Sequence, residues 1–106
     1  MSTNSTDLNK QVIATGSVST AGAVVARAGR WGVSRSSAGV YVIALQEGGV
    51  DATQCVCLAT LRGASGCIRV DQTSDTSKTV STFAVDGTTA TDKDFDFEIS
   101  YLPPGQ

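Results

Sequence analysis

Apolar and polar residues alternate strictly over residues 94–102, which read DFDFEISYL. The apolar side chains on one side of this alternation are those of Phe95, Phe97, Ile99 and Tyr101. The polar side chains on the other side are those of Asp94, Asp96, Glu98 and Ser100. Because successive side chains of a β-strand point to opposite faces, a period of two is typical of a half-buried strand in an antiparallel sheet.

Seven further segments read as short strands, most of them separated by glycine-containing turns. Their ranges are 11–19, 23–28, 31–35, 40–46, 53–60, 66–72 and 79–86. Segments 40–46 and 53–60 are apolar on both faces, which is typical of central strands. No window has helical spacing with caps. The pattern predicts an all-β fold, a single antiparallel β-sandwich of jelly-roll type with about eight short strands.

The 106 residues suffice for one domain. Residues 1–9 are polar and aperiodic, so we expect an extended N-terminal arm, followed by the sandwich over residues 10–106. Alternation along the strands also predicts which side chains form the core. The expected core residues are Tyr41, Ile43, Leu45, Val56, Leu58, Ile68, Val70, Phe83, Val85, Phe95, Phe97 and Ile99.

Charge is unevenly distributed along the chain. Residues 1–70 have a net charge of +3 and residues 71–106 a net charge of −5. If the fold separates the two parts, complementary contacts between subunits follow; if it interleaves them, the separation disappears. The residues that we expect to contact another subunit or a partner are Arg27, Arg30, Trp31, Arg35, Asp94, Asp96 and Glu98.

The chain contains no histidine, which removes the commonest general base and the commonest metal ligand. A Ser-His-Asp arrangement is therefore excluded. A serine–lysine pair needs a buried lysine, and Lys10, Lys78 and Lys93 all lie in polar sequence surroundings. We therefore expect no catalytic residue and no enzyme activity.

No metal or cofactor site is expected. Cys55, Cys57 and Cys67 are too few to close a zinc site without histidine, and are read as small buried apolar side chains. The spacing Asp92-x-Asp94-x-Asp96 resembles the start of a calcium loop, but position six is Phe97, where the loop needs glycine. These aspartates are expected to face solvent or a basic partner.

Trp31 lies between Arg30 and Arg35 in the one cluster of aromatic and basic residues. Such a tryptophan either stacks on a sugar or base, or packs in a core or subunit interface, and packing is the commoner role. The net charge of −2 and the lack of a basic stripe argue against a nucleic-acid partner. No apolar run reaches the length of a membrane span, and no signal peptide is evident, so no membrane partner is expected.

Three segments resemble a pattern found in small virion proteins of tailed phages. These segments are WGVSRSSAGVYVI at 31–43, KTVSTF at 78–83 and DKDFDF at 92–97. The resemblance covers residues 30–102. It implies a jelly-roll trimer that is a capsid decoration or cement protein, or the tip of a tail or head fibre.

Between these roles, the short chain and its polar arm favour a capsid decoration protein. This non-enzymatic structural protein would stabilise the assembled shell through multivalent contacts with the major capsid protein and with itself, as a homotrimer. It would be made in the host cytoplasm and lie on the capsid exterior. The alternative is a fibre tip that binds a host receptor or a surface glycan, with Trp31 as the stacking residue assisted by Tyr41 or Tyr101.

Overall fold

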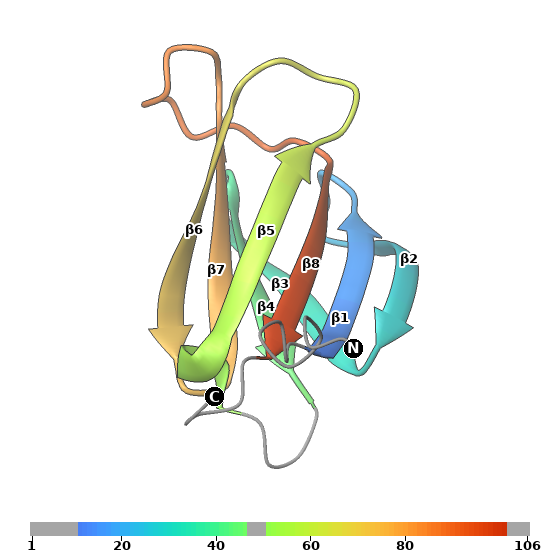
Figure 1. The fold of residues 1–106 in the computed structure, drawn as a ribbon. Helices are drawn as coiled ribbons and strands as arrows, with labels where there is room; N and C mark the ends of the chain where they lie inside the picture. The colour runs from blue at the N-terminus through green and yellow to red at the C-terminus, as the bar shows by residue number, and fades with distance from the viewer. Residues whose placement is uncertain (1–10, 47–50, 102–106) are drawn as a thin grey trace, which may run out of the picture.

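The computed structural model describes residues 11–46 and 51–101, so the predicted arm at residues 1–9 lies outside the described residues. Two four-stranded antiparallel sheets face each other (Figure 1). Sheet A has the strand order β2-β1-β8-β5, and sheet B has the order β3-β4-β7-β6. The strands are β1 (Gln11–Val18), β2 (Val24–Gly29), β3 (Trp31–Ser37), β4 (Val40–Leu45), β5 (Cys55–Leu61), β6 (Cys67–Ser74), β7 (Ser77–Phe83) and β8 (Phe95–Tyr101). A short 3-10 helix, η1 (Ala52–Gln54), precedes β5.

The predicted sandwich of eight short antiparallel strands is confirmed. Each of the eight predicted ranges contains one observed strand or overlaps most of it. The jelly-roll type of the sandwich stays a prediction, because consecutive strands pair as hairpins within one sheet in both halves of the sandwich. The order of the strands is the detail that the alternation pattern did not predict: three hairpins join β1 to β2, β3 to β4 and β6 to β7.

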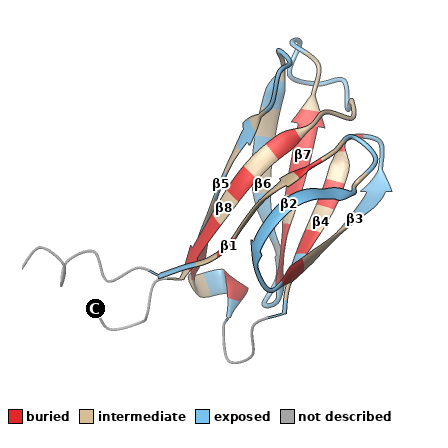
Figure 2. Cartoon of the chain, turned by 90° about the vertical axis from the view of Figure 1, so that its right-hand side faces the viewer, coloured by how far each residue is buried: buried red, intermediate tan, exposed pale blue. Residues whose placement is uncertain are grey.

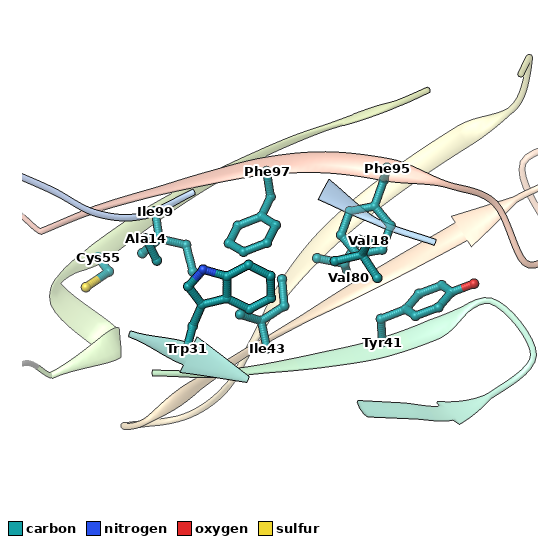
Figure 3. Close-up of a cluster of buried hydrophobic side chains, with 10 residues drawn as sticks. All are labelled: Ala14, Val18, Trp31, Tyr41, Ile43, Cys55, Val80, Phe95, Phe97 and Ile99. Carbon is teal, nitrogen blue, oxygen red and sulfur yellow. The ribbon is translucent and has the colours of Figure 1, made fainter. Parts of the chain in front are cut away.

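The core lies between the two sheets (Figure 3). Its fully buried large side chains include Trp31 and Tyr41 from sheet B and Phe95 and Ile99 from sheet A. The Trp31 ring meets the Phe97 ring edge-on, with their centroids 4.7 Å apart. Burial of each such side chain contributes roughly 1.5–3 kcal/mol to stability. The alternation is therefore confirmed within β8, whose residues Phe95, Phe97 and Ile99 pack into the core.

Most of the expected core residues lie in or against the core. Leu45, Ile68 and Val70 are partly buried and pack against the fully buried cluster. The buried hydrophobic residues outside the expected core list are Ala14, Val18, Trp31, Ala52, Cys55 and Val80. Of these, Cys55 was expected to be a small buried side chain.

Four core assignments are wrong. Val56 and Leu58 point away from the core and are 44% and 61% exposed. Phe83 is half-buried on the side of β7 opposite to Val80, with the Arg69 guanidinium over its ring. Val85 is 75% exposed because β7 ends at Phe83, and alternation no longer applies beyond the strand end.

Gly16 shows how closely the sheets pack at Trp31. A Cβ atom built on Gly16 would lie 2.3 Å from the indole ring and 2.6 Å from the carbonyl oxygen of Ala26. No side chain fits there without a shift of backbone or ring. The absence of a side chain at position 16 therefore makes room for the largest residue of the core.

Candidate interaction surface

The outer face of sheet A, the face turned away from the core, has an unusual apolar component. Directly opposite residues of neighbouring strands share a face, so the registers of β1, β8 and β5 define three rows across it. These rows are Val12–Ser100–Val56, Thr15–Glu98–Leu58 and Ser17–Asp96–Thr60. The solvent-facing side of an antiparallel sheet is usually polar. Here Val12, Val56 and Leu58 are exposed by 44% to 61%.

Two shallow hollows flank strand β8 on this outer face. The larger, of about 430 Å³, is lined by small residues of β1 and β2 such as Gly16, Ala26 and Ala28. The smaller, of about 280 Å³, is lined by Leu58, Thr60 and Glu98 among others. Asp96 borders both hollows. The face therefore combines exposed aliphatic side chains with two acidic residues of the central strand β8, Asp96 and Glu98. Such a face suits contact with another protein better than enclosure of a small molecule.

The three acidic residues predicted as contacts differ in their surroundings. Asp94 accepts a hydrogen bond from the backbone N–H of Thr20 at 2.8 Å. Asp96 accepts a hydrogen bond from the Ser17 hydroxyl at 2.6 Å and pairs with Arg62 at 3.2 Å. For Glu98, which is half-buried, no side-chain partner is found within the described part of the chain. Of the three predicted acidic contacts, Glu98 is therefore the one whose carboxylate is available to a partner.

The arginines predicted as contacts are also mostly engaged within the chain. Arg27 donates to the carbonyl oxygen of Trp31 at 2.7 Å, and its guanidinium lies 5.0 Å from the centre of the Trp31 ring. Arg35 pairs with Asp92 at 2.9 Å. Arg30 is exposed and has no side-chain partner among the described residues. Sequence reasoning missed Arg62, because its pairing with Asp96 depends on the register of β5 against β8.

Trp31 is not a surface contact. Its side chain is completely buried, and its indole N–H donates to the carbonyl oxygen of Ala28 at 3.1 Å. The packing role is confirmed, while the assignment of Trp31 to a partner surface is wrong. Tyr41 is also completely buried, so neither ring can stack on a glycan. Tyr101 is the half-exposed member of the predicted glycan-binding set.

Asp92 connects the loops at one end of the sandwich. One of its carboxylate oxygens accepts hydrogen bonds from the Gly39 N–H at 2.7 Å and from the Tyr41 hydroxyl at 3.2 Å. The single proton of the Tyr41 hydroxyl is shared with the carbonyl oxygen of Thr20, at 2.8 Å. The hydrogen bond from Arg35 is the main reason why the pKa of Asp92 lies below its ordinary value. Burial, the largest cause, raises the pKa of Tyr41 to about 12.

This network also settles where the spacing Asp92-x-Asp94-x-Asp96 places its carboxylates. Asp92 faces Arg35 and Tyr41, Asp94 faces the Thr20 backbone, and Asp96 faces Ser17 and Arg62. Within the described residues, no group of three His, Cys, Asp or Glu side chains is placed to hold a metal ion.

Lys78 differs from its sequence expectation. It belongs to β7, its side chain extends toward β5, and it is only 8% exposed, not in polar surroundings at the surface. Its ammonium group donates to the carbonyl oxygen of Cys55 at 2.8 Å and to the Gln72 side-chain oxygen at 2.6 Å. These bonds direct the ammonium to two oxygen acceptors, neither of them a serine hydroxyl.

The cysteines occupy three different environments. Cys55 is buried, Cys57 is half-buried and Cys67 is exposed, so the expectation of small buried side chains is wrong for Cys67. Burial raises the pKa of the Cys57 thiol to about 11. The thiol therefore stays protonated near neutral pH, which makes it a poor nucleophile.

Comparison with protein-family models, with curated proteins and with solved structures gave no significant match. Among the described residues, no helix has the length and apolar character needed to cross a membrane. The properties of the surfaces are therefore the basis for a functional proposal.

Proposed function

We propose that the protein is a non-enzymatic structural protein that binds other protein subunits, specifically a capsid decoration protein of a tailed phage. Its partners are the major capsid protein and further copies of itself. In this proposal it lies on the exterior of the virion and stabilises the shell through many weak contacts that act together. The family resemblance implies a homotrimer, which is the alternative to the two-fold dimer proposed below from the edge of sheet A.

The observation that carries the proposal is the exposed aliphatic group on the outer face of sheet A. Leu58 is 61% exposed and lies in register with the half-buried Glu98, while Val12 and Val56 flank Ser100 in the next row. A broad face with shallow hollows fits a protein surface. Burying these side chains against a shell subunit would supply hydrophobic free energy, and Glu98 would supply orientation toward a basic group.

The alternative, a fibre tip that stacks on a glycan, has weaker support. The buried rings of Trp31 and Tyr41 remove two of its three expected stacking residues. A glycan array with the purified protein tests what remains. Binding that is lost in Tyr101→Ala would favour the fibre tip over the decoration protein.

The decisive experiment uses particles of the phage that encodes the chain. Quantitative mass spectrometry of purified virions should find the protein in a fixed ratio to the major capsid protein. Particles stripped of the protein should rebind it saturably and regain resistance to heat. If the protein is absent from purified particles, or present without a fixed ratio, the proposal is wrong.

A pair of variants locates the contact. Leu58→Gln keeps the size of the side chain but removes its apolar surface, and should weaken rebinding by about tenfold, as expected for the loss of roughly 1.4 kcal/mol. Val85→Gln is the matched control, because Val85 is a similarly exposed aliphatic residue in a loop outside sheet A. Equal affinities of the two variants would argue against the sheet A face as the capsid contact.

A further inference from the structure

Strand β2 lies at one edge of sheet A and pairs only with β1 within the sheet. All six of its residues are exposed (Figure 2). An edge strand presents a row of backbone N–H and C=O groups that have no partner in the sheet, which makes it a template for pairing with another strand. Among the strands described, β2 is the one with every residue exposed.

The composition of β2 offers little protection against such pairing. Four of its residues are aliphatic, namely Val24, Val25, Ala26 and Ala28. Natural edge strands are commonly protected by charged side chains, proline or β-bulges. Of these, β2 has a register shift against β1 between Val24 and Ala26, while its remaining residues continue the ladder. The single charged residue, Arg27, is directed to the carbonyl oxygen and ring of Trp31. Edge strand β6 of sheet B, by contrast, contains the exposed charged pair Arg69 and Asp71.

The charges at the two ends of β2 favour a second copy as its partner. After β2 ends at Gly29, the exposed Arg30 follows with no side-chain partner among the described residues. At the other end, Asp94 is hydrogen-bonded to Thr20 in the turn that precedes β2. Arg35 also lies beside this turn, near Gly22, but its charge is balanced by Asp92.

Antiparallel pairing of two β2 strands brings the Arg30 end of each copy beside the Asp94 end of the other, twice in one symmetric contact. An alignment centred on Ala26 also places Arg27 opposite Val25 of the second copy, so that the two Arg27 residues do not face each other. Both the backbone groups and the charges of β2 are therefore complementary to those of an identical strand.

We propose that two copies of this chain pair through β2, antiparallel and with two-fold symmetry, so that their A sheets form one continuous eight-stranded sheet. The contact involves the edge of sheet A and leaves the exposed Leu58 side of the sheet free for another partner. It does not depend on the capsid role: a dimer that is absent from virions would refute the proposed function and leave this inference standing.

Sedimentation velocity over a range of concentrations tests the proposal directly. The wild-type protein should reach twice the chain mass, and hydrogen exchange should show protection of β2 amides that increases with concentration. Val25→Lys should shift the protein to the monomer, because it places a charge at a position that is 59% exposed on the edge strand. Val85→Lys makes the same charge change in a loop and should remain dimeric; circular dichroism should show that both variants are folded.

A second pair of variants tests the antiparallel alignment. Arg30→Glu should weaken the dimer because it places like charges together, and Arg30→Glu combined with Asp94→Arg should restore it. If the protein stays monomeric at every concentration, the proposal is overturned, and β2 would at most pair with a strand of another protein. A trimer would overturn it in favour of the three-fold assembly implied by the resemblance. Dimerisation that survives in Val25→Lys would place the contact elsewhere and also overturn it.

Discussion

The two open sides of the sandwich are each bridged by one cationic side chain, yet the two bridges differ in depth. On the β5/β6 side, Lys78 of sheet B donates to the carbonyl oxygen of Cys55 in sheet A and is 8% exposed. On the β2/β3 side, Arg27 of sheet A donates to the carbonyl oxygen of Trp31 in sheet B and is exposed. The first cation is part of the interior, while the second covers the interior from outside.

This difference shows that the two sheets are joined by buried contacts on one side of the sandwich, while an edge strand on the other side stays free to bind another chain. On the β5/β6 side, a hydrogen bond from a buried charge joins the sheets, and removal of that charge would take a donor from the Cys55 carbonyl oxygen. On the β2/β3 side, the bulk of Trp31 fills the space, and Arg27 only covers its ring. Strand β2 is thus held mainly by β1, which leaves its outer edge free for an intermolecular contact.

Removal of the tryptophan should have the largest effect. Trp31→Ala should lower the free energy of unfolding by about 3–5 kcal/mol, because it creates a cavity beside Phe97 and Gly16. Chemical denaturation followed by circular dichroism measures this loss. Trp31→Phe keeps much of the ring and should lose less. A loss below about 1 kcal/mol for the alanine variant would mean that the β2/β3 side is not filled by this side chain.

The two cations should differ in their cost when each is replaced by methionine, which is similar in length and apolar. Lys78→Met should cost about 1–3 kcal/mol, because the Cys55 carbonyl and the Gln72 side-chain oxygen lose their donor. Arg27→Met is the matched control and should cost about 1 kcal/mol or less, as expected for an exposed cation over a ring. Urea unfolding followed by the fluorescence of Trp31 measures both. Equal costs would remove the distinction between the two sides.

The strands and the face of β8 could be predicted from the sequence because their pattern is unambiguous. Acidic residues alternate with Phe95, Phe97 and Ile99, so only one face of β8 can be buried. The positions of most turns followed from glycine, while the turn at Asp75 and Thr76 between β6 and β7 has none. Both signals are local, and short-range reasoning is sufficient for them.

Strand β5 shows where local reasoning fails. Both of its faces are apolar, and side-chain size suggested that Val56 and Leu58 point inward. The register instead places Cys57 opposite Ile99 and Ala59 opposite Phe97. Because opposite residues share a face, the small residues Cys57 and Ala59 lie inward with Ile99 and Phe97, and Val56 and Leu58 turn outward. The exposed aliphatic face of sheet A therefore results from a pairing that the sequence alone does not specify.

The contact residues were only partly predictable for the same reason. Trp31 was placed in a surface cluster because arginines flank it in sequence, but alternation along β3 turns its ring into the core opposite Phe97. Lys78 appeared exposed because its sequence neighbours are polar. Whether a charged residue is free or paired depends on long-range neighbours, as the pairs of Arg35 with Asp92 and Arg62 with Asp96 demonstrate.

The smallest expected effect concerns Asp92 at the loop end of the sandwich. Its ion pair with Arg35 is partly open to solvent, as Arg27 is, and unlike the buried Lys78. The pKa of Asp92 is lowered in the folded protein, chiefly by the hydrogen bond from Arg35. In the unfolded chain the pKa of an aspartate is about 3.9, and ionised Asp92 therefore stabilises the fold at pH values above that pKa. This contribution is lost as the pH falls through the lower pKa of the folded protein. Asp92→Asn should therefore be less stable than the wild type near neutral pH by about 1 kcal/mol or less.

Since asparagine does not titrate, the difference in unfolding free energy between the two proteins should shrink as the pH is lowered from about 5 toward about 2. Urea denaturation at a series of pH values, followed by Trp31 fluorescence, measures that difference. Asp51 and Asp86 also have lowered pKa values, but both are present in the two proteins, so their contributions cancel. A difference that stays constant over this range would mean that Asp92 acts through the shape of its hydrogen bonds to Gly39 and Tyr41, and its charge would then contribute nothing to joining the loops.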